Sequence, residues 1–254
     1  MTPIAPITID DIISRLTAIV DSSRNAPSKL GYFAALYRKV TIHVKQGIAA
    51  GQFQDGPRME KLDIVFASRY LDAFSSFRAG QPVSQSWRIA FEAASWRTPI
   101  ILQHLLAGMN AHINLDLGIA AAQVAPGAAL ASLQHDFNAI NNVLFSLVAG
   151  VEKEIAGVSP WIGLLEKIGG KTDDVLVEFN MSLARKFAWD VAQTLAPLAP
   201  EQQAAKIKEL DRAASVVGTA VVSPPILLRP GLLLIRSRES TNIPQVIGVL
   251  SQDS

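Results

Sequence analysis

The sequence predicts an all-α fold, a single-domain bundle of eight to ten helices around a buried central helix. Three observations support this class. Apolar residues recur at helical spacing between proline and glycine breaks, and no strand–turn–strand pattern occurs in the first two hundred residues. One long apolar segment carries polar residues on two separate sides, as expected for a helix that is buried all round. A chain of 254 residues that is 49% hydrophobic can bury a large core as one domain.

The first four helices are predicted from caps, breaks and apolar spacing. Thr8 can cap the first helix, and Asp10 and Asp11 fall in its first turn, where the helix dipole favours negative charge. The second helix ends near Gly51, and Pro57 opens the third, which a glycine–proline break stops. The predicted ranges are 4–20, 29–50, 58–79 and 84–95.

The central helix is predicted over residues 98–124, the most apolar long segment of the chain. Each residue of an α-helix advances by about 100°, so His112 and Asp116 project from successive turns of one face. Asn110 and Asn114 fall on nearly the opposite side. Two polar strips separated by Leu, Ile and Ala indicate that the polar groups find partners inside the protein.

The remaining elements follow a break at Pro126. One helix carries an arc of side-chain amides that includes Asn138, which predicts contact with another polar surface. A later helix can be capped by Thr172. The segment 223–254 is apolar and interrupted by prolines, and we expect it to pack on the helical domain of residues 1–222 or to be mobile. The predicted helical ranges are 128–156, 159–170 (a short helix or a loop), 172–195 and 201–217.

Composition excludes several classes of protein. There are 23 basic and 22 acidic residues, and the basic ones are scattered, so no nucleic-acid partner is expected. The absence of cysteine excludes disulfides, thiolate metal sites and cysteine nucleophiles. The N-terminus does not read as a signal peptide, and the polar side chains of the central segment would be costly inside a bilayer. We therefore expect a cytoplasmic protein without an integral membrane span, and a homo-oligomer is left open.

The strongest candidate for chemistry is the pair His112 and Asp116. Spacing of i, i+4 on a helix lets an imidazole and a carboxylate converge on one ion, as in helical metal sites. His104 on the same helix is a third candidate ligand. Asp63 or Glu60 of the third helix and His135 or Asp136 of the sixth could complete the site. Nitrogen and oxygen ligands favour a divalent zinc, iron or manganese ion; otherwise no cofactor is expected. The alternative is that the pair ties helices together.

A second candidate pair lies on the predicted third helix. Asp63 and Tyr70 share one face, so they could supply a carboxylic acid and a phenol to a pocket. The alternative is a buried polar tie between helices. Asn110, Asn114 and Asn138 are candidate hydrogen-bond donors to a substrate. Trp87 is a candidate wall residue, although such an aromatic side chain also serves simple packing.

Three stretches resemble a family of functionally uncharacterised, mostly bacterial proteins. They are PRMEKLDIVFASRYLDAF, SWRIAFEAA and ILQHLLAGMNAHINLDLGIAAA, and the similarity runs from about Gly31 to Asp190. Its most specific part is GMNAHINLDLG at residues 108–118. The resemblance implies a shared site rather than a named reaction. The residues that match its characteristic stretches are Asp63, His104, Asn110, His112, Asn114 and Asp116.

These observations predict a small-molecule enzyme with a polar pocket enclosed by the third, central and sixth helices. The first expectation is a metal-dependent hydrolase or lyase, in which His112 and Asp116 bind a metal or transfer a proton. Its substrate would be small and largely apolar because the pocket walls are apolar. Two alternatives remain: a metal-independent binding protein or cyclase for an apolar metabolite, and a structural helical bundle.

Overall fold

Every regular element is helical in the computed structural model, which describes residues 8–165 and 181–252. Thr172 and the beginning of the helix predicted from it lie outside these residues. The α-helices are α1 (Ile9–Asn25), α2 (Leu30–Ala49), α3 (Gly56–Arg78), α4 (Gln85–Ala93), α5 (Ile101–Met109), α6 (Gly118–Val124), α7 (Leu130–Val158), α9 (Met181–Leu195), α10 (Pro200–Val222), α11 (Arg229–Arg236) and α12 (Ile243–Leu250). Three shorter or irregular helical segments complete them: η1 (Asn110–Leu117), η2 (Gly127–Ala129) and η3 (Ile162–Leu164).

The predicted all-α, single-domain class is confirmed, with a few more helices than expected. Eleven α-helices are described, against eight to ten predicted. The central helix accounts for one of the additional helices, because η1 separates α5 from α6. The others are α11 and α12, which form in the proline-interrupted segment after residue 223. In each of these the proline lies in the first turn, where its missing N–H removes no helical hydrogen bond.

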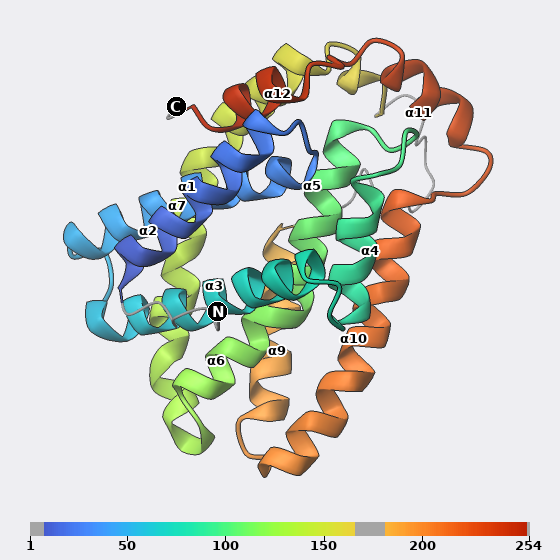
Figure 1. The fold of residues 1–254 in the computed structure, drawn as a ribbon. Coiled ribbons are helices and arrows are strands. Elements are labelled where there is room, and N and C mark those ends of the chain that lie inside the picture. The colour runs from blue at the N-terminus through green and yellow to red at the C-terminus, as the bar shows by residue number, and fades with distance from the viewer. Residues whose placement is uncertain (1–7, 166–180, 253–254) are drawn as a thin grey trace.

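The predicted central helix does run through the middle of the bundle. Its three parts, α5, η1 and α6, form the green segment in Figure 1, with α2 and α7 on one side and α4 and α10 on the other. Helices α9 and α10 pack along η1, and α9 continues along α6. Almost all of the side chains of α5 and η1 are buried. This all-round burial explains why the segment is apolar on most sides.

The middle of the central helix is a π-helix rather than an α-helix. Segment η1 covers eight residues, Asn110–Leu117, and contains His112 and Asp116. A π-helix closes i→i+5 hydrogen bonds, so it turns less per residue than the 100° assumed for an α-helix. The polar side chains therefore point in directions that an α-helical wheel does not give. Irregular turns of this kind are frequent at functional sites.

Two glycines allow neighbouring helices to approach the central helix closely. A Cβ atom at Gly118 would lie 2.6 Å from the backbone oxygen of Ala188 in α9. A Cβ atom at Gly108 would lie 2.5 Å from the ring of Phe33 in α2. Both distances are too short for real atoms, so a larger residue would push α9 or the Phe33 ring away.

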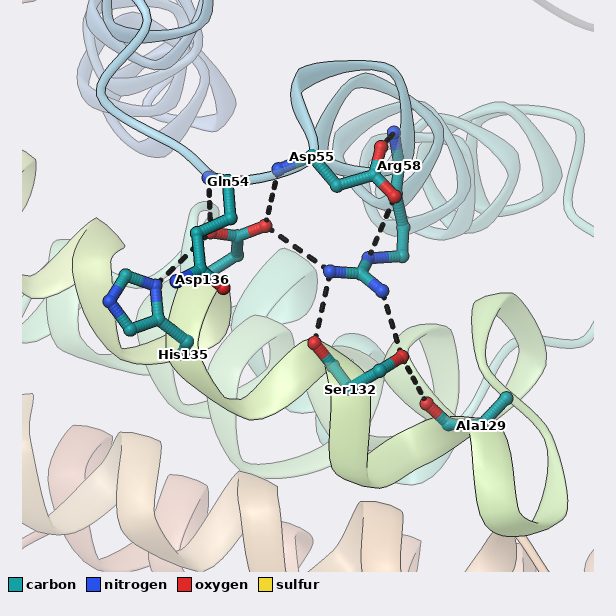
Figure 2. Close-up of polar contacts among 7 residues, drawn as sticks. All are labelled: Gln54, Asp55, Arg58, Ala129, Ser132, His135 and Asp136. Atoms are coloured by element: carbon teal, nitrogen blue, oxygen red, sulfur yellow. Dashed lines mark hydrogen bonds and ion pairs between the residues drawn. The ribbon is translucent and has the colours of Figure 1, made fainter.

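The carboxylate of Asp136 fixes the loop that leads into α3 (Figure 2). It accepts hydrogen bonds from the backbone N–H groups of Gln54, at 2.7 Å, and Asp55, at 2.9 Å, and a weaker one from Arg58. Asp136 is fully buried, whereas the neighbouring His135 is 63% exposed. This carboxylate from α7 therefore serves to position α3, and both of its oxygens are already engaged.

The C-terminal helices pack on the rest of the bundle. Glu239, 6% exposed, accepts hydrogen bonds from the backbone N–H of Ile101 and from the hydroxyl of Ser159, so it occupies the N-terminus of α5. Helix α12 buries Val246 and Ile247 against α1, α2 and α7. In Figure 1 the two C-terminal helices, α11 and α12, lie across one end of the bundle in orange-red and red.

None of the described helices is by itself long and apolar enough to cross a membrane. One pair, 101–124 with 127–144, meets the length and hydropathy requirement only when taken together, and it is bent by 112°.

The close approach at Gly118 yields a stability prediction. Gly118→Ala places a methyl group against a backbone oxygen, so we expect it to destabilise the fold by roughly 1–3 kcal/mol. Gly157→Ala in α7 is the matched control, because nothing lies within 4 Å of its added Cβ. Alanine is the better helix former, so this change should be neutral or stabilise by up to about 1 kcal/mol. Urea unfolding measures the stability of both variants. An equal effect of the two substitutions would contradict the close packing of α9 against Gly118.

Candidate functional site

The polar centre of the bundle is the carboxylate of Asp116 on η1. It accepts a 2.7 Å hydrogen bond from Arg69 Nε of α3 and another 2.7 Å bond from Trp87 Nε1 of α4. Nδ1 of His112 lies 3.8 Å from its Oδ2, beyond hydrogen-bond distance. Burial by itself would raise the pKa of Asp116, but the facing His112, Arg69 and Trp87 groups outweigh it and lower that pKa. Asp116 is therefore an ionised carboxylate whose two oxygens each have a partner.

The imidazole of His112 lies among aromatic rings. It stacks on Phe66 with a centroid distance of 3.6 Å, and Tyr37 meets it edge-on at 4.3 Å. Burial lowers the pKa of His112, against the opposing effect of Asp116. The ring is thus neutral near pH 7. Neither of its nitrogens has a hydrogen-bond partner among the described residues, so its capacity to donate and accept is unused.

A cavity of about 290 Å³ adjoins this histidine, between α2, α3, α5, η1, α7 and α9. Most of its wall consists of Leu, Ile, Val, Phe and Met side chains, and we call it the apolar cavity. Apolar pockets with a few convergent polar groups are the usual form of a small-molecule site. The polar side chains in this wall are Tyr37, Asp63, His112, Asn141, Glu152 and Arg185.

Asp63 brings an unpaired carboxyl group to the apolar cavity. The side chain is 7% exposed, and its Oδ2 atom is buried without a hydrogen-bond partner. Burial, with a smaller contribution from Glu60, raises the pKa of Asp63 to about 7. The hydroxyl of Tyr37 is also buried without a partner, and burial followed by the charge of Asp63 raises its pKa well above the usual value. Asp63 can therefore gain or lose a proton near neutral pH.

Arg185 brings a buried guanidinium to the same cavity from α9. Its Nε donates to Asn141 Oδ1 at 2.7 Å, and an Nη group donates to the backbone oxygen of Phe137. The guanidinium also lies 4.5 Å from the centre of the Phe137 ring. Burial lowers the pKa of Arg185 to about 10, which leaves it charged at pH 7.

All four predicted catalytic residues lie near one another, and the Tyr70 ring meets that of His112 edge-on with a centroid distance of 6.2 Å. His112 and Asp116 are neighbours, and Asp63 shares the wall of the apolar cavity with His112. Tyr70 is fully buried but does not line the cavity. Its ring packs against Phe33 and its hydroxyl has no partner in the described chain.

The predicted substrate-binding residues lie outside the apolar cavity. Asn114 donates to Asn110, and Asn110 donates to the backbone oxygen of Ala214, so these amides join η1 to α10. Asn138 is exposed on α7, whereas Asn141 of the same arc of amides lines the cavity. Trp87 is buried, but it contacts the site through its bond to Asp116.

The residues present do not favour the predicted metal. Within 8–165 and 181–252, no group of three or more histidines and carboxylates is close enough together to hold a metal ion. A cation at Asp116 would also face the guanidinium of Arg69. His104 contacts the ring of Tyr32 instead, and burial lowers its pKa to about 3. A zinc, iron or manganese ion stays a prediction without a donor set in the described chain.

Sequence reasoning missed Tyr37 and Arg185. Tyr37 falls among the apolar residues of the helix predicted over 29–50, a position typical of a core side chain. Arg185 had a detectable signal, because Met181, Ala188 and Ala192 occupy the same face of a helix at i−4, i+3 and i+7. A charged side chain inside an apolar stripe indicates either a buried ion pair or a site.

These observations define an all-α protein whose bundle contains a partly open, mostly apolar cavity lined by a few buried polar groups. Residues 9–224 match the model of a family described as a family of unknown function, DUF5995, and the chain belongs to that family. No curated protein and no solved structure matches the chain.

The raised pKa of Asp63 predicts how stability depends on pH. Because the folded state holds this proton more tightly than the unfolded state, stability should fall as pH rises from about 4 to about 7. The shift from 3.8 to about 7 corresponds to roughly 4 kcal/mol, an order-of-magnitude figure. Asp63→Asn should remove this part of the pH dependence, as measured by urea unfolding between pH 4 and 8.

The control is Asp72→Asn, which changes an exposed aspartate on the same helix. It should leave the pH dependence of the wild-type protein in place. Parallel stability curves for the wild-type and Asp63→Asn proteins would show that Asp63 is not the buried acid described above.

Proposed function

We propose that the protein binds a small, largely apolar molecule in the apolar cavity. The observation that carries this proposal is a cavity of about 290 Å³ with an apolar wall and unsatisfied polar groups. Empty apolar cavities half that size bind small hydrocarbons, because the ligand restores contacts that the wall lacks. The polar groups would orient the ligand.

The positions of the unpartnered polar groups support a binding site over a structural bundle. Native proteins leave few buried polar atoms without a hydrogen bond. Tyr37, Asp63 and His112 each have such an atom, and all three line the same cavity. Asn110 and Asn114, which join η1 to α10, are paired by contrast. Tyr70 and His104 also carry a buried unpartnered atom, but neither lines the cavity.

Filling the cavity tests the binding proposal. Ile140 of α7 lines the wall, so Ile140→Phe should weaken binding of a neutral apolar ligand such as 1-decanol at least tenfold. Ile226→Phe makes the same change at a position that is 74% exposed, and it should bind like the wild-type protein. Isothermal titration calorimetry measures both affinities. Equal binding of 1-decanol by the wild-type and Ile140→Phe proteins would refute the proposal.

A second candidate function is a proton-transfer enzyme acting in the same cavity, of lyase type. The observation that favours it is Asp63, whose pKa lies near 7 and whose free oxygen is in the wall with the neutral His112. General bases work best when their pKa lies near the working pH. In such an enzyme Asp63 would take a proton from a carbon atom of the substrate. Asp116 and Arg69 would hold η1 and His112 in place.

A probe reaction tests Asp63 as a base without knowledge of the natural substrate. In 5-nitrobenzisoxazole, removal of the ring C–H proton breaks the N–O bond and releases a coloured cyanophenolate. We expect the wild-type protein to accelerate this reaction roughly 100-fold over Asp63→Asn, with a rate that rises through pH 7 as Asp63 ionises. Asp72→Asn should retain the wild-type rate. Equal rates for the wild-type and Asp63→Asn proteins would exclude the enzymatic role.

A further inference from the structure

The position of Arg185 narrows the chemical class of the ligand. This guanidinium is 5% exposed and lies in the wall of a cavity that is otherwise mostly apolar. Burying a cation is expensive unless an anion compensates it. Yet no ion pair involves Arg185 in the described part of the chain, where its partners are an amide oxygen, a carbonyl oxygen and a ring.

Arg185 makes two hydrogen bonds to the described residues. A guanidinium has five N–H groups, and Asn141 and Phe137 accept from two of them, so three have no partner within residues 8–165 and 181–252. The two existing bonds fix the orientation of the planar group. A guanidinium held in this way is suited to accept a carboxylate through two parallel hydrogen bonds.

The two acidic side chains in the cavity wall do not neutralise the charge of Arg185. Glu152 lines the cavity but is exposed on α7, and no ion pair joins it to Arg185. Asp63 lies on α3 and is largely protonated below pH 7, so it adds little negative charge to the cavity there. Apart from the uncharged polar groups of Tyr37, His112 and Asn141, the remaining wall consists of Leu, Ile, Val, Phe and Met side chains.

We propose that the ligand of the apolar cavity is a small amphiphile with one carboxylate and a hydrocarbon body, and that Arg185 binds the carboxylate. This inference rests on the proposed binding function. One guanidinium balances a single negative charge, so a monocarboxylate fits better than a phosphate monoester, which carries close to two charges at pH 7. The apolar wall would hold the hydrocarbon, with about a fourfold gain in affinity per buried methylene until the cavity is full.

The test compares two ligands that differ in the head group alone. Decanoate and 1-decanol are titrated into the full-length protein at pH 6.5, where decanoate is ionised and Asp63 is mostly protonated. We expect decanoate to bind roughly 10- to 100-fold more tightly than 1-decanol, because a hydrogen bond to a charged group adds about this much affinity. Octanoate and hexanoate should bind progressively more weakly than decanoate, by about fourfold for each methylene removed. Decyl phosphate should also bind more weakly than decanoate.

Two substitutions test the role of Arg185 itself. Arg185→Met keeps an apolar side chain of similar length, and it should abolish the preference for decanoate while 1-decanol binds as before. Asn141→Asp places a carboxylate 2.7 Å from Arg185 Nε and so supplies the missing anion from within the protein. It should remove the same preference without unfolding the protein. Lys186→Met, at an exposed neighbouring position, is the charge-matched control and should change neither affinity.

The outcomes separate this inference from the binding proposal. If neither 1-decanol nor decanoate binds the wild-type protein, the binding function itself fails. If 1-decanol binds as tightly as decanoate, or if both Arg185→Met and Asn141→Asp keep the preference for decanoate, the cavity is a neutral apolar site and the assignment of Arg185 is overturned.

Discussion

The arrangement of the bundle depends on one buried carboxylate. Asp116 is 1% exposed, and a lone charge at such a depth would destabilise the protein by several kcal/mol. Arg69 and Trp87 compensate it from two other helices, so α3 and α4 are held in one orientation against η1. The carboxylate therefore acts as a three-helix junction. The aromatic rings of Trp87 and Phe66 around His112 complete this junction on its apolar side.

The junction and the apolar cavity meet at His112. One side of this residue belongs to the structural centre, because its Nδ1 approaches Asp116. The other belongs to the cavity, because its ring lies in the wall with Tyr37 and Asp63. A rigid polar centre next to an under-filled apolar space is a suitable foundation for a binding site, since the walls are held without a ligand. Arg185 adds positive charge from a helix that does not contribute to the junction.

The sequence predicted the helices well because their signals are local. Thr8 caps α1 as predicted, and the structure adds a capping box with Asp11; Pro57 lies in the first turn of α3. The central helix was predicted from its apolar length and its two polar strips, and it is buried as expected. The π-helical geometry of residues 110–117 could not be predicted in this way. It has no strong residue preference of its own, and the contacts of η1 with α9 and α10 are made by distant parts of the chain.

For the candidate site, sequence by itself determined that polar side chains such as His112, Asp116 and Asp63 would be buried, because each interrupts an apolar helical pattern. Only the tertiary structure decided what each one meets. Asp116 meets Arg69 and Trp87, Asn110 meets a backbone oxygen of α10, and Asp63 faces the apolar cavity. Periodicity along one helix reports which side is buried, but the partner on that side comes from residues tens of positions away. Their placement follows from the packing of the whole bundle.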